Sequence, residues 1–380
     1  MGTLTAASSQ SPRTHDQEVL RTWVRSLEDL PAAPPAQRRT VSTSTVEDRT
    51  ILVGSIAAGL ALAWVICFRL LPWGNPLAFT LAAFVLFLAI VTVTTSAVSP
   101  GPAVADRLAS ALVTGGAAVV GIALVTTVGF TFLRGMGALP HLNMFTHDMA
   151  GTGPRAPLSQ GGVLHAIVGS VIQVGIAIAV TVPLALGTAV FMTEIGGGFA
   201  RVVRTVVEAM TALPSIVAGL FIYTVLLVGL GVPRSGFAAA MALSVMMLPI
   251  IARAADVVLR VVPSGLREAS LALGASRWRT VWHVVLPTAR PGLATALILG
   301  IARGVGETSP VLLTSGASTY LVGDPFSSAM NSLPLFVFST VRSGEPIYIQ
   351  RGFAAATILL VLVLVLFVVA RLLARQRTGR

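Results

Sequence analysis

An arginine and a glutamate lie one helical turn apart inside an apolar run, where a charged side chain needs a partner or a polar environment. Arg303 lies about ten residues into the run Leu293–Thr314, a depth of about 15 Å at roughly 1.5 Å per residue. A charge at that depth costs several kcal/mol unless it is paired, hydrated or facing a polar cavity. Glu307 is four residues further on and within reach. Arg303 therefore either donates hydrogen bonds to an anion that crosses the membrane, or forms a structural ion pair that fixes helix packing.

The remaining residues argue against catalysis by this chain. The basic residues other than His are all Arg, and a P-loop requires a Lys for the nucleotide phosphates, so a partner must bind Mg²⁺ and hydrolyse any ATP. The single Cys67 lies in an apolar run, which excludes an intrachain disulfide. His141, His147 and Asp148 are close in sequence, and we interpret this as a loop coincidence. We predict no catalytic residue, no metal site and no cofactor in this chain.

A hydrophilic stretch, Pro263–Pro291, lies between two long apolar runs, and we call it the elbow. Ser264 is placed to cap a short helix, with Glu268 in its first turns, near the positive end of the helix dipole. Gly274 is suited to end that helix in a left-handed conformation. Arg277–Val285 predicts a second short helix, which Pro287 should end. The elbow is too polar to span a membrane and is shaped to dock into a cleft of another protein.

The elements around the elbow are membrane spans. Hydrophobic residues make up 54% of the 380 residues and charged residues 11%, against about a quarter charged in ordinary soluble domains. We predict an all-α polytopic membrane protein with about eight spans, each near the roughly 20 residues that a bilayer requires: Ile51–Leu71, Leu77–Val98, Leu108–Leu133, Leu164–Phe191, Val202–Leu230, Gly236–Leu259, Leu293–Thr314 and Phe353–Leu373. Pro183, Pro214 and Pro249 fall inside runs, where spanning helices tolerate proline.

The charges orient these spans. A net charge of +11 would also fit nucleic-acid binding, but the charges lie in loops and tails between apolar runs. Cytoplasmic loops carry an excess of Arg, and an even number of spans with the N-terminus inside places most arginines, the elbow and the C-terminus in the cytoplasm. Residues 1–48 predict a disordered cytoplasmic tail, and 376–380 a short cytoplasmic C-terminal tail.

The elbow resembles the EAA loop of ABC importer permeases, written EAA-x3-G-x9-I-x-LP. Glu268, Ala269, Ser270, Gly274, Leu286 and Pro287 occupy its positions, with Ser270 in place of the second Ala and Val284 in place of Ile. In that family the loop sits in a groove of the ATP-hydrolysing subunit. The resemblance implies that these six residues couple the chain to such a subunit.

From about Leu139 onward the chain resembles the permeases of phosphate importers, the PstA type. The likeness rests on Leu139–Thr146, Gly161–Ser170, Ala209–Gly219, Ile301–Leu313 and Met330–Pro334. It implies a six-helix permease domain at 108–375, preceded by two additional helices at 49–107. The implied partners are a second permease (PstC type), ATPase subunits (PstB type) and an external phosphate-binding protein (PstS type), at the bacterial plasma membrane.

The same resemblance gives roles to three residues. Arg303 and Glu307 match an Arg and a Glu implicated in the anion path of phosphate permeases. Arg253 matches a family Arg near the cytoplasmic end of its span, where exit of the anion and snorkelling to lipid headgroups are both open. Gly304 stands where the family commonly has Ala, which predicts a close helix approach. Permeases for molybdate, sulfate or phosphonate stay open as alternatives, as does, more remotely, a membrane carrier or scaffold outside the ABC class.

Overall fold

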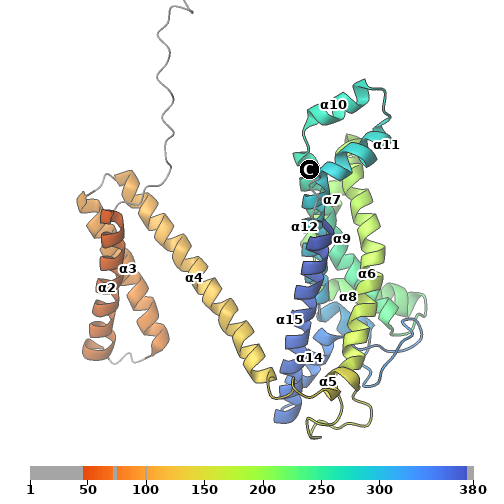
Figure 1. Ribbon diagram of the computed structural model, residues 1–380, viewed down its shortest axis with the longest axis horizontal. Coiled ribbons are helices and arrows are strands. Elements are labelled where there is room, and N and C mark those ends of the chain that lie inside the picture. Colours follow the sequence, from red (N-terminus) through yellow and green to blue (C-terminus); the bar gives the residue numbers. More distant parts are fainter. Residues whose placement is uncertain (1–45, 72–74, 99–100, 375–380) are drawn as a thin grey trace, which may run out of the picture. The chain divides into compact units, whose positions relative to one another are not determined.

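The computed structural model describes residues 46–71, 75–98 and 101–374, and every regular element within these ranges is a helix (Figure 1). The predicted all-α polytopic class is confirmed. Most of the predicted N-terminal tail and all of the predicted C-terminal tail lie outside the described residues. The chain divides into two compact units, one ending at Val120 and one beginning at Gly121.

The first unit contains the N-terminal hairpin. Helix α2 (Val46–Val65), extended by the π-helical segment η1 (Ile66–Leu70), packs on α3 (Pro76–Val98). Gly59 permits this close packing, because a Cβ there would lie 3.0 Å from the backbone nitrogen of Phe87. Helix α4 (Gly101–Gly135) begins in this unit. These helices confirm the first three predicted spans as long, apolar helices.

The second unit is built on four long helices: α6 (Leu164–Val190), α9 (Gly236–Val261), α12 (Leu286–Val305) and α15 (Pro346–Ala374). Its shorter helices are α5 (Asn143–Thr146), α7 (Gly197–Thr211), α8 (Ser215–Ile222), α10 (Ser264–Ala272), α11 (Arg277–Thr280), α13 (Ser309–Thr314) and α14 (Leu333–Val341), and its π-helical segments are η2 (Phe191–Ile195), η3 (Tyr223–Gly229) and η4 (Val281–Val285). Many of the residues buried on α6, α9 and α12 are Gly, Ala or Ser, as in helix packing within membranes.

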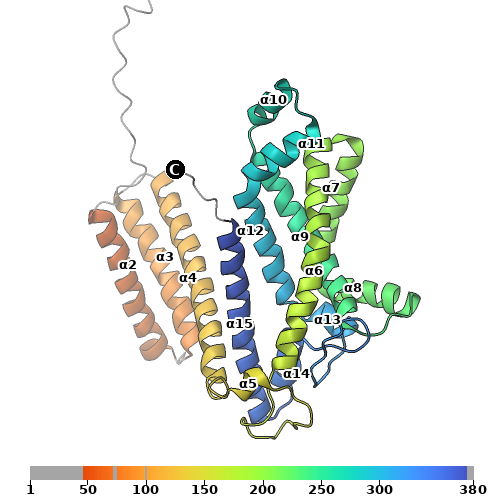
Figure 2. The same cartoon turned by 45° about the vertical axis from the view of Figure 1, so that its right-hand side comes forward.

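Helices α6 and α9 run in the same direction (Figure 2). Both begin beside the same loop, since a Cβ on Gly169 would meet the Asn331 carbonyl and a Cβ on Gly236 would meet the Met330 sulfur. Their far ends meet again, where Ala189 and Leu259 share one apolar cluster. The chain must therefore return from one end of the unit to the other between these two helices.

The returning segment is broken, so the span predicted at Val202–Leu230 consists of two helical segments and is not one continuous helix. Helix α7 and the segment formed by α8 and η3 are bent by 108° at the break. Pro214 precedes α8 and has no N–H to continue the helix, whereas Pro183 and Pro249 stay inside α6 and α9. Because α6 and α9 are parallel, the bent pair counts as one crossing. The described residues then hold eight crossings, seven long helices and this pair.

Candidate translocation path and elbow

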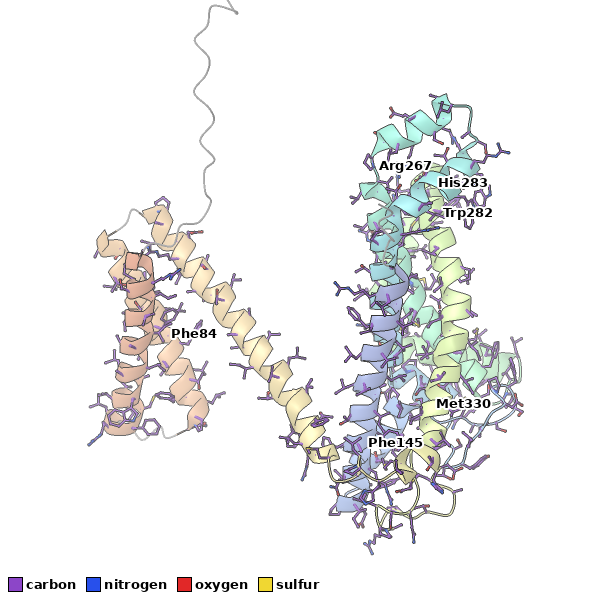
Figure 3. All side chains as sticks on the ribbon, viewed as in Figure 1. Phe84, Phe145, Arg267, Trp282, His283 and Met330 are labelled. Atoms are coloured by element: carbon purple, nitrogen blue, oxygen red, sulfur yellow. The ribbon has the colours of Figure 1, made fainter. Side chains whose placement is uncertain are left out.

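The elbow consists of α10, a turn, and α11 continued by η4 (Figures 1 and 3). Gly274 has φ +82°, so the predicted left-handed turn is confirmed. Ser264 is the first residue of α10 and forms no side-chain cap, so the predicted cap is wrong. Glu268 lies beyond the first turn of α10, on its exposed surface, and is not at the positive helix end.

A hydrogen bond links the two arms of the elbow. The Ser270 and Thr280 hydroxyl oxygens are 2.9 Å apart, and Thr280 is buried. Ala269 is exposed, while Leu286 packs against the apolar cluster where α6 and α9 end. The outer surface of the elbow carries exposed apolar side chains, among them Leu273, Trp278 and Trp282. Such a patch, on a polar stretch, is typical of a surface that a partner covers.

Pro287 does not end the second helix of the elbow, contrary to the prediction. The chain is helical without interruption from Arg277 to Val305, so α11, η4 and α12 form one rod. Pro287 lies in the first turn of α12, directly after the wider π-helical turn. That wider turn leaves room for the proline ring, which would otherwise clash with the carbonyl four residues earlier. One end of this rod is in the elbow, and Arg303 is at the other.

Arg303 and Glu307 lie beside a helix break, not in mid-helix as predicted. Helix α12 ends at Val305, and α13 starts at Ser309. Pro310 has no N–H to offer the Gly306 carbonyl, which accounts for the break. The predicted ion pair is present, with Arg303 Nε 3.5 Å from Glu307 Oε1. The Arg303 side chain is 57% exposed and that of Glu307 14%, so the guanidinium keeps donors free of its partner carboxylate.

Glycines place α12 directly against α9. A Cβ on Gly304 would meet Met247, one on Gly300 would meet Ile251, and one on Gly292 would meet Val258. The close approach predicted at Gly304 is therefore confirmed. This antiparallel register places Arg253 only about 7–8 Å further along the helix axis than Arg303. The two arginines thus lie within about two helical turns of each other in depth.

The glycine contact gives a first testable prediction. Gly304→Ala should lower the thermal stability of the purified chain, by roughly 1 kcal/mol or more, because the added methyl presses on Met247. Met247→Ala alone should cost more, because it empties a fully buried site. In the double variant the loss should be smaller than the sum of the two single losses, since the shortened side chain no longer obstructs the methyl. Thermal unfolding in detergent measures all three variants. A loss in the double variant that equals or exceeds that sum would contradict this packing.

Arg253 belongs to a charged cluster between α7 and α9. Its Nη1 is 2.7 Å from Glu208 Oε1 and 3.7 Å from Asp256 Oδ2. Asp256 is 1% exposed and also pairs with Arg204 and Arg260, both at 3.3 Å. Asp256 therefore pairs with two arginines of its own helix, Arg253 and Arg260, and with Arg204 of α7. Arg253 is fixed by carboxylates of its own chain while 43% of its side chain stays exposed.

Arg267 is the elbow residue that the sequence reasoning missed. Its Nε and Nη2 donate to Glu194 Oε1 at 3.1 and 2.9 Å, and its Nη1 and Nη2 donate to the Val262 and Leu259 carbonyls at 2.7 and 2.8 Å. Those carbonyls belong to the last turn of α9 and to its C-cap residue, where helix carbonyls lack intrahelical partners. The available signal was weak, because Glu194 is 73 residues away in the sequence.

The loops at the opposite end use their charges for structure. Asp148 accepts from the backbone N–H groups of Leu321 and Ala150, and the Leu321 bond holds the pKa of this carboxyl below its ordinary value. Buried Arg351 donates to the carbonyls of Ala156, Pro157 and Gln160. Within residues 46–71, 75–98 and 101–374, no three His, Cys, Asp or Glu side chains are grouped to hold a metal ion.

Comparison with known proteins gives consistent matches. A family model described as "Binding-protein-dependent transport system inner membrane component" matches residues 181–379. The phosphate transport system permease protein PstA 1 of Mycobacterium tuberculosis (strain CDC 1551 / Oshkosh) is 38% identical over 260 residues, which is 68% of this chain and 85% of that protein. The phosphate permease PstA of Pasteurella multocida (strain Pm70) is 31% identical over 252 residues, 66% of this chain and 87% of its own. Among solved structures, the inward-facing MetNI methionine ABC transporter matches at 22% identity with a TM-score of 0.41, over 56% of this chain and 91% of that chain.

Proposed function

Since this chain belongs to the binding-protein-dependent inner membrane transport components, in their PstA-type phosphate permease branch, we propose that it is a transmembrane subunit of an ATP-driven importer of inorganic phosphate. The observation that carries the proposal is the 38% identity over most of a phosphate permease. The chain would form half of the pathway, and a second permease subunit the other half. ATPase subunits would supply the energy, and an external binding protein would deliver phosphate.

The direct experiment is reconstitution of transport. A complex purified through a tag on this chain should contain a second permease and ATPase subunits. In proteoliposomes with its binding protein, it should accumulate labelled phosphate only when ATP is present. Molybdate, sulfate and phosphonate are the competing substrates to offer. Uptake of one of these in preference to phosphate would replace the substrate and leave the permease assignment in place.

We propose that the elbow docks on an ATPase subunit through its exposed surface. The patch of Leu273, Trp278 and Trp282 supports this, because a cytoplasmic partner would cover side chains that are costly to leave in water. Glu268, Ala269 and Ser270 lie on the first arm of the elbow, α10, and Gly274 sets the angle between α10 and α11. Leu286 and Pro287 lie within the rod, which runs from the second arm of the elbow to Arg303.

We propose that Arg303 contacts the passing anion, with Glu307 and Arg253 as its neighbours along the path. The free donors of Arg303 suit the oxygens of phosphate. Glu307 would orient the guanidinium and keep affinity low enough for release. Arg253, about 7–8 Å nearer the elbow along the helix axis, would meet the anion as it leaves.

Orientation gives a second prediction. Eight crossings with a cytoplasmic N-terminus place the elbow and the C-terminus in the cytoplasm. A cysteine introduced in the elbow, in a Cys67→Ser background, should react with a membrane-impermeant thiol reagent only after the cells are opened. A cysteine at Gly153, in an exposed loop at the opposite end of the unit, should react in intact cells. Labelling of Gly153→Cys only in opened cells would reverse the orientation and remove the elbow from the ATPase side.

A further inference from the structure

Arg267, labelled in Figure 3, connects its own helix to two other elements with one side chain. It belongs to α10, its ion pair reaches Glu194 in η2 at the end of α6, and its other hydrogen bonds reach the end of α9. The Arg267 and Glu194 side chains are only 22% and 14% exposed, so solvent screens this pair less than a surface ion pair. A planar guanidinium that makes four hydrogen bonds is held in one orientation.

The other polar contacts of the elbow do not provide this connection. The hydrogen bond between Ser270 and Thr280 joins the two arms of the elbow to each other. Ser276 caps α11 by accepting from the Arg279 N–H, again within the elbow. Glu268 is exposed on α10. Among these polar side chains, Arg267 is therefore the one that connects α10 to the ends of α6 and α9.

Glu194, the partner of Arg267, lies close to a chain of polar contacts that ends at Arg253. Glu194 lies in the same π-helical turn as Met192, whose carbonyl accepts from Arg204 Nη2 at 3.0 Å. Arg204 pairs with buried Asp256, and Asp256 pairs with Arg253. These polar contacts, joined between Glu194 and Met192 by the backbone of η2, run from the elbow through α7 and α9 to the exposed guanidinium near the proposed exit of the anion. π-Helical turns are frequent at functional sites.

We propose that Arg267 is a positioning residue that latches the elbow to the ends of α6 and α9 throughout the transport cycle. Movement of the elbow by the ATPase then moves η2 and α9 with it, and so repositions Arg253 and Glu208. The inference rests on the proposed function, because it presumes that an ATPase moves the elbow. The ion pair of Arg267 with Glu194 would transmit this movement, and we expect it to stay closed throughout the cycle.

The test compares phosphate transported per ATP hydrolysed in proteoliposomes of the complete complex. Glu194→Gln and Arg267→Gln should each lower this ratio by about tenfold, the factor expected from a lost charge-assisted hydrogen bond. The double variant should be no worse than the poorer single variant, because the two residues act as one unit. ATPase subunits should co-purify in all three cases. Glu345→Gln is the matched control, since it breaks a 2.8 Å ion pair with Arg155 in the loops at the other end and should keep the wild-type ratio.

A cross-link separates a latch from a simple folding contact. With Cys67→Ser as background, Glu194→Cys and Arg267→Cys should transport poorly when reduced. A short bifunctional thiol reagent that joins the two positions should restore much of the ratio. A ratio that the cross-link fails to raise, or lowers further, would overturn the proposal, because a latch that stays closed should tolerate the link. A wild-type ratio in Glu194→Gln, which keeps the Arg267 bonds to α9, would also overturn it. If Gly274→Val left uptake intact, the proposed role of the elbow angle in coupling would fail instead.

Discussion

Gly274→Val is expected to lower phosphate uptake by about tenfold, while the chain still inserts and assembles with its partner permease. Gly274 has φ +82°, and nothing lies within 4 Å of an added Cβ, so the substitution acts only through the backbone. A β-branched residue in the left-handed region costs about 1–2 kcal/mol, which is near a tenfold change in population. The turn should relax to another conformation, and α10 should lose its angle to α11. Uptake normalised to the amount of chain in the membrane measures the effect.

The control for backbone strain is built into the chain. Gly344 has φ +78° and equally open surroundings, but it lies in the turn before α15, outside the elbow. Gly344→Val should carry the same strain and leave uptake near the wild-type rate. Equal losses in the two variants would attribute the effect to general destabilisation. Wild-type uptake in Gly274→Val would remove the elbow angle from the coupling mechanism.

The elbow illustrates what sequence can specify. The left-handed turn at Gly274 follows from one residue type and its offset, because glycine is the residue that adopts positive φ without steric cost. Long apolar helices follow from the length of the runs. The ion pair of Arg303 with Glu307 was predicted from their four-residue separation, and it forms although α12 ends between the two residues. All of these signals are local, and each needs only a few consecutive residues.

The features that the sequence did not predict correctly are the effects of individual prolines and the contacts between residues far apart in the chain. Pro214 and Pro310 accompany breaks, whereas Pro183, Pro249 and Pro287 lie within continuous helices. Neighbouring helices and π-helical turns decide between these outcomes, and the residue type alone does not. Arg267 was indistinguishable from other basic residues of the elbow, since its importance depends on Glu194 and on the end of α9. Tertiary contacts of this kind leave no periodic pattern in a single sequence.

The rod from Arg277 to Val305 connects the two proposed sites, the docking surface of the elbow and Arg303. A helix of 29 residues transmits displacement of one end to the other, because its backbone hydrogen bonds resist compression. The elbow end would move with the ATPase, and Arg303 is in the last turn of the other end. The break after Val305 then allows this end to shift without displacing α13, which packs on α8 and α9. Arg303 is thus placed where a movement of the elbow could change its access to the anion.

Arg303→Gln is expected to lower phosphate uptake at least about a hundredfold, since a bidentate pair of charge-assisted hydrogen bonds is worth roughly 3 kcal/mol or more. Glutamine keeps some hydrogen-bonding capacity and loses the charge. Because Glu307 is 14% exposed, the single variant also leaves a mostly buried carboxylate without its cation. The variant Arg303→Gln with Glu307→Gln removes that second effect, and we expect it to assemble with the partner permease yet still fail to transport. Glu307→Gln alone should assemble and keep a low KM, with a reduced maximal rate, because release of the anion becomes slower. Co-purification and uptake are measured together for all three. A double variant that transports at the wild-type rate would show that Arg303 serves only to balance Glu307, and the anion path would then have to be sought elsewhere in the chain.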